Sequence, residues 1–328
     1  MRPFIVGSIA LALSIAPQAA EARNIVITND DGLSNNVLAL YRALKEDGHD
    51  VIVSVPCVNQ SGMGTALKIG RPLGPLRESC RNGAAQAGAP GAGPITRNDV
   101  PGQDFHYVDG TPIMAMLYGV DVVGAKRWGS APDLVLSGPN EGQNVGAIVL
   151  SSGTVSAAQA ASVRGLSAIA LSAGGSTVDD SALANPDSAK VAKLSAELVR
   201  RLAKLSGTSP ILPRGIALNV NFPDTLDGAT WKAARIGSFN TYQMRFVEDM
   251  AASASPTMKA TARQHGMELL HLPGLSVEMN DKTPSQVQAS DESVVYKSAI
   301  SVSPMQAGYE PTALDGWSAW LIDAIASD

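Results

Sequence analysis

The sequence predicts an α/β protein of three layers, in which a mostly parallel sheet lies between two layers of helices. Short runs of β-branched and apolar residues alternate with stretches whose apolar residues recur at helical spacing, the pattern of a doubly wound sheet. The strand runs are apolar throughout and end at turn residues, as strands buried on both faces do. Polar clusters follow three of these strands, at the edge where open parallel sheets bind their ligands.

The first part of the chain contains one complete strand–helix–strand unit. Residues 24–28 form a β-branched run that ends in turn residues. Apolar residues between positions 37 and 44 recur on one helical face, and Gly48 follows where a helix C-cap belongs. Residues 51–55 form the next strand, so the segment predicts a βαβ unit and the sheet is expected to be Rossmann-like.

The alternation continues downstream, with a less regular region after it. The expected strands are 134–137, 168–172 and 216–221, and the expected helices are 155–164, capped by Thr154, and 187–205. Residues 83–94 are rich in Gly, Ala and Pro and predict a flexible surface excursion outside the sheet. We therefore expect an α/β core over residues 23–222 and a C-terminal β-rich extension over residues 223–328.

Residues 1–22 predict a cleaved signal peptide. Arg2 is the only charge before an apolar run from Phe4 to Ala16, and Ala20-Glu21-Ala22 offers a small-x-small cleavage pattern. The run is shorter than the ~20 residues that a membrane-spanning helix needs, although an uncleaved anchor is the alternative. We expect a periplasmic or secreted protein with no membrane span after signal removal.

Composition narrows the class of partner. The chain has 328 residues, a formal net charge of −5 and no basic run, so it lacks the electrostatic footprint of a protein that binds a nucleic-acid polymer. A small soluble molecule is the expected substrate. Cys57 and Cys80 form a disulfide or remain two buried thiols, and the former is favoured in an exported chain.

Four oxygen-bearing side chains follow three different predicted strands and are expected to converge at one edge of the sheet. They are Asp30, Asp31, Ser61 and Asn140. Two carboxylates, a hydroxyl and an amide oxygen suit Mg²⁺ or Mn²⁺, with Ca²⁺ as a further option, better than Zn²⁺. An Asp-Asp-Gly sequence after a strand is also an ordinary turn, so the motif alone leaves that reading open.

A second polar region predicts a phosphate site. A glycine-containing segment after the third strand includes Asn144, and Ser152, Gly153 and Thr154 open a helix. Backbone N–H groups at a helix N-terminus favour anions, and Asn144 and Ser152 add side-chain donors. Ordinary helix capping by Ser152 or Thr154 is the alternative.

Five ordered sequence blocks carry a resemblance to a known family. The blocks are Ile27–Leu33, Asn59–Gly64, Asp109–Pro112, Leu136–Gly146 and Ser152–Val155. Together they resemble the SurE (survival protein E) family of metal-dependent 5′/3′-nucleotidases, some of them described as acid phosphatases. The resemblance implies the same four metal ligands, phosphate contacts at Asn144 and Ser152, and a homodimer or tetramer. The family's usual acidic pair is replaced here by Ala147-Ile148, which puts substrate preference in doubt.

These observations predict a metal-dependent phosphomonoesterase that hydrolyses nucleoside monophosphates to nucleoside and phosphate. Asp30 and Asp31 are the expected catalytic residues, with a water attacking phosphorus. Direct attack by Asp30 to form an aspartyl-phosphate stays open. A non-catalytic nucleotide- or metal-binding α/β protein is the main alternative. A serine hydrolase is disfavoured because the chain has no G-x-S-x-G elbow.

Overall fold

The structure is a computed structural model that describes residues 22–178, 182–264 and 267–308. The predicted signal peptide lies outside these residues except for its last position. The strands are, in chain order, β1 (Asn24–Thr28), β2 (Asp50–Pro56), β3 (Ala92–Pro94), β4 (Phe105–Val108), β5 (Leu134–Glu141), β6 (Ala168–Ala173), β7 (Ile216–Asn221), β8 (Trp231–Ala233), β9 (Tyr242–Val247), β10 (Gly274–Met279) and β11 (Ile300–Gln306). The α-helices are α1 (Asn35–Glu46), α2 (Pro112–Tyr118), α3 (Ala125–Trp128), α4 (Gly153–Val163), α5 (Pro186–Ser206), α6 (Met250–Ser253), α7 (Pro256–Gln264) and α8 (Glu292–Val295).

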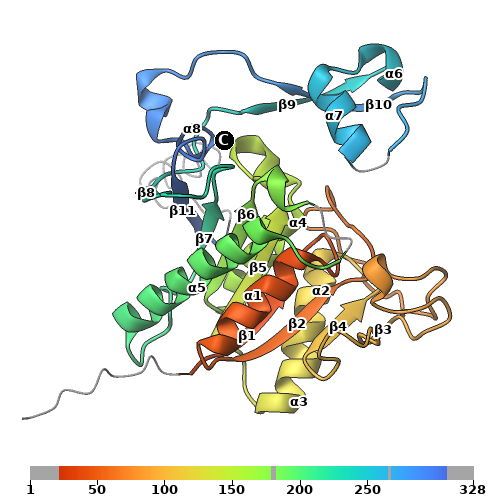
Figure 1. Cartoon of the computed structure of the whole chain (residues 1–328), viewed down its shortest axis with the longest axis vertical. Helices are drawn as coiled ribbons and strands as arrows, with labels where there is room; N and C mark the ends of the chain where they lie inside the picture. Colours follow the sequence, from red (N-terminus) through yellow and green to blue (C-terminus); the bar gives the residue numbers. More distant parts are fainter. Residues whose placement is uncertain (1–21, 179–181, 265–266, 309–328) are drawn as a thin grey trace, which may run out of the picture.

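Nine strands form one sheet in the order β3-β4-β2-β1-β5-β6-β7-β11-β8 (Figure 1). The six strands from β4 to β7 in this order are parallel, which confirms the predicted α/β class. At the edges, β3 is antiparallel to β4, and β11 is antiparallel to β7. Because β1 lies between β2 and β5, the loops that follow these three strands leave the sheet side by side.

Helices cover both faces of this sheet (Figure 1). Alternate residues of the central strand β1 pack against the helices on opposite faces of the sheet. Ile25 and Ile27 belong to the core that α1 and α5 share, whereas Val26 belongs to the core beneath α2 and α4. The predicted apolar face of α1 is buried, and three fully buried alanines let α4 pack closely on the sheet: Ala157, Ala158 and Ala161. The sequence pattern therefore specifies the layers correctly.

The expectation that residues 83–94 lie outside the sheet is wrong for their last three residues. Ala92–Pro94 is the edge strand β3. The hydroxyl of Tyr107 donates to the carbonyl of Pro90 at 2.7 Å, and a disulfide joins Cys57 to Cys80 with their Cα atoms 4.6 Å apart. Glycine-rich composition does not reveal these long-range contacts, which depend on β4 and on the end of β2.

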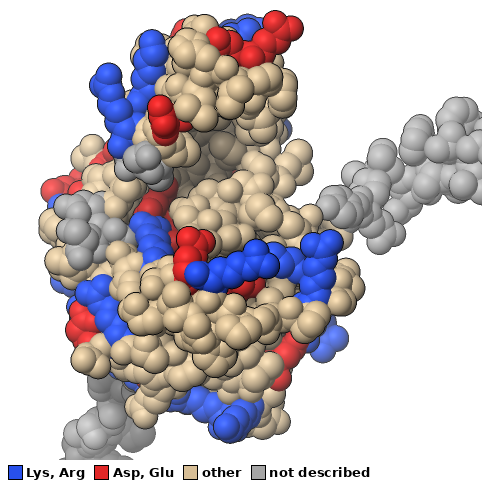
Figure 2. Space-filling view, turned by 90° about the vertical axis from the view of Figure 1, so that its right-hand side faces the viewer, with Lys and Arg blue, Asp and Glu red and all other residues tan. Residues whose placement is uncertain are grey.

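One part of the C-terminal region belongs to the nine-stranded sheet, and another part lies outside it. From the predicted extension, β11 and β8 complete the far edge of the nine-stranded sheet. By contrast, β9 and β10 form a separate antiparallel pair with α6 and α7 beside it. Figure 2 shows the surface hollowed between this upper part and the body of the molecule. Among the described helices, none is both long and apolar enough to span a bilayer.

Candidate active site

The first strand ends in a tight loop that holds two aspartates at the edge of the sheet. The side-chain amide of Asn29 closes this loop, because its Nδ2 donates to the carbonyl of Gly32 at 2.8 Å and its Oδ1 accepts from the Gly32 N–H at 3.1 Å. Gly32 has a φ of +89°, and a Cβ there would lie 3.0 Å from the carbonyl oxygen of Pro56. The turn therefore requires glycine, and it leaves Asp30 and Asp31 buried at the carboxyl end of β1.

Asp30 lies against the start of α4. Its Oδ1 accepts a hydrogen bond from the Thr154 hydroxyl at 2.5 Å. A Cβ on Gly153 would come within 2.7 Å of the Asp30 Cβ, so only glycine lets the helix N-terminus approach this closely. Burial raises the pKa of the Asp30 carboxyl above its ordinary value, and the hydrogen bond from Thr154 opposes the rise. The dipole of α4 further favours negative charge here.

Asp31 is held by three neighbouring segments. Its Oδ2 accepts from the Glu141 N–H at 3.2 Å, and its Oδ1 lies 3.4 Å from the Asn59 side-chain nitrogen. Its main-chain carbonyl accepts from the Arg81 guanidinium at 2.9 Å. Burial, followed by repulsion from Asp30 and Glu141, raises the pKa of Asp31 well above its ordinary range, and Arg81 opposes this rise. Two adjacent buried carboxyls thus lack full compensation for their charge.

Asn140 approaches this pair from β5, where the strand departs from regular pairing. The register with β6 shifts between Ser137 and Asn140, and the intervening Gly138–Pro139 peptide is cis. Asn140 Nδ2 donates to the carbonyl of Gly142 at 2.8 Å. Its Oδ1 is buried and has no hydrogen-bond partner among the described residues. A buried oxygen of this kind is suited to a cation, because an unpaired acceptor is otherwise costly.

Ser61 lies on the loop that follows β2, and it is exposed. The Gln60 N–H donates to the main-chain carbonyl of Asp30 at 2.7 Å, which ties this loop to the end of β1. The Ser61 N–H donates to the Asn59 side chain at 2.8 Å, and Asn59 also reaches Asp31. The structure therefore brings the three predicted strand-end loops together at one edge, by contacts that join Asp30, Asp31 and their neighbours.

The residues predicted to contact phosphate fall into two groups. Ser152, not Thr154, is the N-cap of α4, because its hydroxyl accepts from the Val155 N–H at 3.1 Å. Thr154 lies in the first turn, where its hydroxyl is directed to Asp30. Asn144 is buried, and its Nδ2 donates to the Ser172 hydroxyl at 2.9 Å. Ser152, Gly153 and Thr154 thus adjoin Asp30, whereas a side-chain donor of Asn144 points into the protein.

The chain between Asn144 and Ser152 is supported by buried polar side chains. Asn219 Nδ2 donates to the Asn144 carbonyl at 2.9 Å and to the carboxyl of Glu292 at 2.9 Å. Glu292 also accepts from the Gly146 N–H at 3.1 Å. Burial raises the pKa of Glu292 to about 7, and hydrogen bonds from Ser303, Gly146 and Asn219 oppose this rise. A titratable group therefore lies directly behind the candidate phosphate segment.

Sequence reasoning missed the residues that surround the aspartates, chiefly Arg81 and Glu141. Glu141 belongs to a recognised block, but its position beside Asp31 depends on the pairing of β1 with β5. Arg81 comes from the segment between the second block and β3, residues 65–91, hereafter the glycine-rich insert, in which no block falls. The one available signal is its neighbour Cys80, because a disulfide to Cys57 would bring position 81 to the end of β2.

Within residues 22–178, 182–264 and 267–308, no group of three or more His, Cys, Asp or Glu residues is placed to hold a metal ion. The candidate set instead combines two carboxylates with Ser and Asn oxygens.

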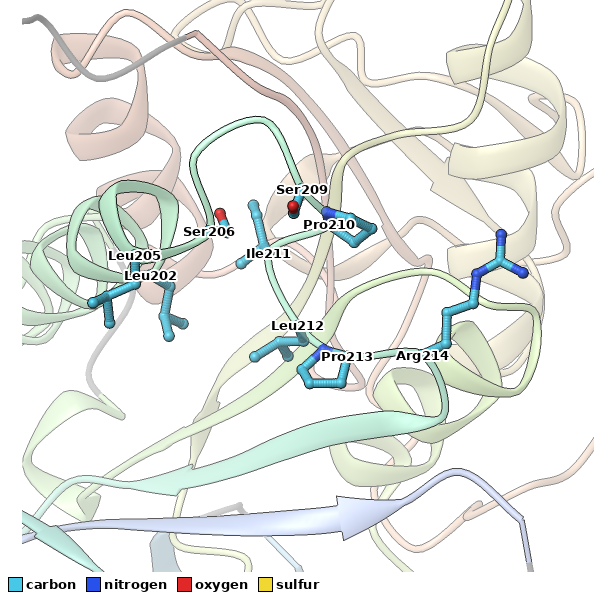
Figure 3. A pocket seen from close by; sticks show the side chains of 9 residues that line it. All are labelled: Leu202, Leu205, Ser206, Ser209, Pro210, Ile211, Leu212, Pro213 and Arg214. Carbon is cyan, nitrogen blue, oxygen red and sulfur yellow. The ribbon is translucent and has the colours of Figure 1, made fainter.

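A hollow of about 390 Å³ lies elsewhere, between the end of α5 and the start of β7, and is lined by residues including Leu202, Ile211 and Arg214 (Figure 3). It adjoins the amino end of β7, the opposite end from the candidate site.

The model of one protein family, described as "Survival protein SurE", matches residues 25–244. The chain belongs to the SurE family. This match spans β1 to β9 and includes the whole candidate site. The five blocks that carry the resemblance in the sequence all fall inside it.

Three relatives of known name match the chain over different lengths. An acid phosphatase of Yarrowia lipolytica is 35% identical over 64% of this chain and 59% of its own length. A 5′-nucleotidase SurE of Lawsonia intracellularis is 31% identical over 61% of this chain and 66% of its own length. The chain thus spans less than two thirds of these two relatives. A 5′-nucleotidase SurE of Acinetobacter baylyi is 32% identical over 86% of this chain and 93% of its own length.

The fold is that of a solved SurE structure. The crystal structure of the SurE protein from Aquifex aeolicus superposes with a TM-score of 0.62 and covers 91% of this chain and 99% of that one. Sequence identity is 24%, so this comparison concerns the fold. It confirms the predicted Rossmann-like α/β architecture.

Proposed function

We propose that this protein is a metal-dependent phosphomonoesterase that hydrolyses nucleoside monophosphates to nucleoside and phosphate. The observation that carries the proposal is the contact of Asp30, the first residue of the aspartate pair, with the N-terminus of α4 at one edge of the sheet. A carboxylate pair beside a helix N-terminus offers a cation site and a phosphate site in contact with each other. The names of the relatives, 5′-nucleotidase and acid phosphatase, support this reaction class.

The residues present fit a single divalent cation. Asp30, Asp31, Ser61 and Asn140 would hold it, and the unpartnered Oδ1 of Asn140 is the observation that supports the assignment. All four ligands are oxygens, which favours Mg²⁺ or Mn²⁺, with Ca²⁺ as a further candidate. When bound, the cation would neutralise charge on the phosphate and stabilise both aspartates in their ionised form.

The start of α4 would orient the phosphate. The N–H groups around Gly153 and the dipole of the helix favour an anion at this end. Ser152 would add its hydroxyl, whose oxygen caps the helix while its proton remains free to donate. Asn144 would contribute through its remaining amide proton, since one donor is engaged by Ser172. These groups bind the phosphate in one orientation, which lowers the entropic barrier to attack.

A water molecule is the better nucleophile for this arrangement than Asp30 itself. Thr154 holds one oxygen of the Asp30 carboxylate, and the close approach of Gly153 restricts movement of the side chain. Its other oxygen would be committed to the cation, whereas an aspartate that attacks phosphorus needs an oxygen free to form the new bond. Asp30 and Asp31 would instead accept a hydrogen bond from the attacking water and orient it toward phosphorus.

The proposal extends to the export of the protein and to its oligomeric state. The apolar segment at the start of the sequence supports release into the periplasm or secretion, and the Cys57–Cys80 disulfide is consistent with an oxidising compartment. The face in Figure 2 intersperses Lys and Arg with Asp and Glu, in keeping with a small-molecule substrate. We expect a homodimer or a tetramer, because SurE proteins commonly associate.

Phosphate release from a substrate panel tests this proposal. Metal-free protein, obtained with EDTA, is assayed on 5′- and 3′-nucleoside monophosphates and on p-nitrophenyl phosphate after addition of Mg²⁺, Mn²⁺ or Ca²⁺. Activity should appear only with a divalent cation and should be lost in Asp31→Asn, whose fold is checked by circular dichroism. Metal-independent turnover, or an active Asp31→Asn, contradicts the proposal. Saturable nucleotide binding without phosphate release would instead identify a non-catalytic binding protein.

A further inference from the structure

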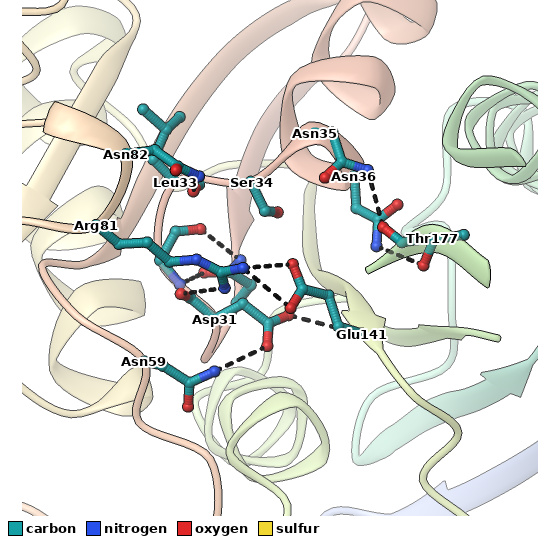
Figure 4. Close-up of polar contacts among 12 residues, drawn as sticks. Asp31, Leu33, Ser34, Asn35, Asn36, Asn59, Arg81, Asn82, Glu141 and Thr177 are labelled. Atoms are coloured by element: carbon teal, nitrogen blue, oxygen red, sulfur yellow. Dashed lines mark hydrogen bonds and ion pairs between the residues drawn. The ribbon is translucent and has the colours of Figure 1, made fainter. Parts of the chain in front are cut away.

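A third carboxylate lies beside the two aspartates, and an arginine from the glycine-rich insert contacts it. The Arg81 guanidinium donates to both oxygens of the Glu141 carboxylate, at 2.9 and 3.1 Å. The same guanidinium donates to the main-chain carbonyl of Asp31 at 2.9 Å. Figure 4 shows Arg81 directed at both groups at once, with the Asp31 carboxylate close to Glu141. Arg81 therefore links the insert to the ends of β1 and β5.

The position of Arg81 is fixed through its backbone. Its neighbour Cys80 is disulfide-bonded to Cys57 at the end of β2, and the Arg81 N–H donates to the carbonyl of Cys57 at 2.8 Å. On its other side, Asn82 Nδ2 donates to the carbonyl of Leu33 at 2.9 Å. The insert is thus anchored on both sides of Arg81. The guanidinium is therefore already positioned beside Glu141 and Asp31, so little further conformational entropy is lost when the substrate binds.

Charge explains why an arginine is needed there. The Glu141 side chain is 1% exposed, so water screens its negative charge poorly. With Asp30 and Asp31, it makes three carboxylates facing a region that should receive an anionic phosphate. A divalent cation balances the charge of two carboxylate ligands, whereas a third uncompensated carboxylate would leave the site net negative and repel phosphate. One guanidinium nitrogen, Arg81 Nη2, contacts both carboxylate oxygens of Glu141 and offsets their charge.

We propose that Arg81 is a positioning residue of the active site that neutralises Glu141 and holds the Asp31 main chain, so that an anionic phosphomonoester can approach the aspartate pair. The inference rests on the proposed function. It assigns a role to the insert, which would deliver a compensating charge to the site without contacting the reacting atoms.

The test compares four variants: Arg81→Met, Glu141→Gln, the double variant of both, and Arg77→Met as a control. Arg77 is an exposed arginine of the same insert, four positions earlier. Hydrolysis of p-nitrophenyl phosphate is measured at saturating Mn²⁺, and Mn²⁺ is titrated calorimetrically into each metal-free protein. Inorganic phosphate is titrated into the Mn²⁺-loaded proteins as a readout that does not require turnover.

Arg81→Met should raise KM about tenfold, the scale of one partly screened charge–charge interaction, and leave kcat within about twofold. Its affinity for Mn²⁺ should be unchanged or tighter, because a positive charge has been removed near the cation. The double variant should lower KM from the Arg81→Met value toward the wild-type value, since the opposing carboxylate is gone too, while the bond to the Asp31 carbonyl remains absent. A merely structural role would not produce this rescue. Arg77→Met should behave as wild type.

Three results would overturn the proposal: an unchanged KM in Arg81→Met, weaker Mn²⁺ binding in that variant, or no recovery in the double variant. Failure of the two proposals can be told apart. If the wild type releases no phosphate but binds inorganic phosphate more tightly than Arg81→Met does, the proposed function fails and the role of Arg81 stands. If the wild type is active and Arg81→Met matches it in KM and in phosphate affinity, the role of Arg81 fails and the function stands.

Discussion

The hydroxyl of Thr154 donates to the carboxylate of Asp30 at 2.5 Å, across a sequence separation of 124 residues. This bond joins the first turn of α4 to the loop after β1, and both partners are buried. This bond fixes the position of the helix N-terminus relative to the carboxylate. Through this contact Thr154 orients Asp30, one of the two acids on which the proposed chemistry depends.

Thr154→Val should therefore impair both stability and activity. Valine preserves the shape of the side chain but leaves the buried Asp30 oxygen without its donor, which should cost about 1–3 kcal/mol in the free energy of unfolding. We expect kcat to fall about tenfold as Asp30 loses its orientation. Urea denaturation and steady-state kinetics measure the two effects. Thr154→Ser retains the hydroxyl and is the control; equal losses in both variants would contradict this role.

Gly153→Ala should disturb the site through sterics alone. The new Cβ would lie 2.5 Å from the Pro112 Cγ and 2.7 Å from the Asp30 Cβ, so the helix start has to move away. Overpacking of this kind costs about 1–3 kcal/mol, and phosphate affinity should fall with the displaced N–H groups. Gly74→Ala is the matched control, because a Cβ there meets nothing within 4 Å. A fully active Gly153→Ala would show that α4 does not hold the phosphate.

Asn140→Ala should weaken metal binding more than it weakens the fold. It removes the buried Oδ1 that has no protein partner among the described residues. Loss of even an outer-shell group lowers metal affinity by about 10–100-fold, so a direct ligand should matter at least as much. Calorimetry with Mn²⁺ measures the change, and thermal unfolding without metal supplies the baseline. Unaltered Mn²⁺ affinity would exclude Asn140 from the ligand set.

Glu292 should make stability fall as pH rises toward neutrality. Its pKa is raised from an ordinary value of 4.5 to about 7 in the folded protein, so folding favours the protonated form. The contribution is fully present below pH 4.5 and is lost as pH rises through 7, and it amounts to about 3 kcal/mol. Glu292→Gln should remove this dependence. Urea denaturation of both proteins from pH 5 to pH 8 measures it, and a pH-independent difference between them would contradict the assignment.

Replacing both cysteines by serine should reproduce part of the rise in KM that is expected for Arg81→Met. The disulfide spans 23 residues, and its loss should lower the free energy of unfolding by about 3 kcal/mol. Because Cys80 precedes Arg81, KM for a phosphomonoester should also rise. Adding Arg81→Met to the Cys57→Ser/Cys80→Ser variant should then change KM little further. A full additional increase would show that the disulfide and Arg81 act independently.

The strands and the aspartate pair could be predicted from sequence because their signals are local. Residues 24–28 are continuously apolar and the next residues are turn formers, so both the strand and its polar end are visible in one short segment. Convergence of the loops followed from the rule that parallel strands present their carboxyl ends at one edge. The pairing of β1 with both β2 and β5 confirms that reasoning.

The contacts around the aspartates could not be predicted in the same way. Arg81 reaches Glu141 only because a disulfide, a hydrogen bond to Cys57 and the order of the strands act together. None of these is periodic in sequence. Thr154 was expected to cap its helix because threonine is a common N-cap, but Ser152 two positions earlier takes that place and releases the Thr154 hydroxyl for Asp30.

The adjacency of β1 and β5 also has a kinetic consequence. The bond between Glu141 and Asp31 joins residues 110 positions apart, and β5 pairs with a strand formed near the start of the described chain. A nascent polypeptide that has emerged only as far as β4 holds both aspartates but lacks Asn140, Glu141 and the first turn of α4. The proposed ligand set is therefore complete only after β5 has paired with β1.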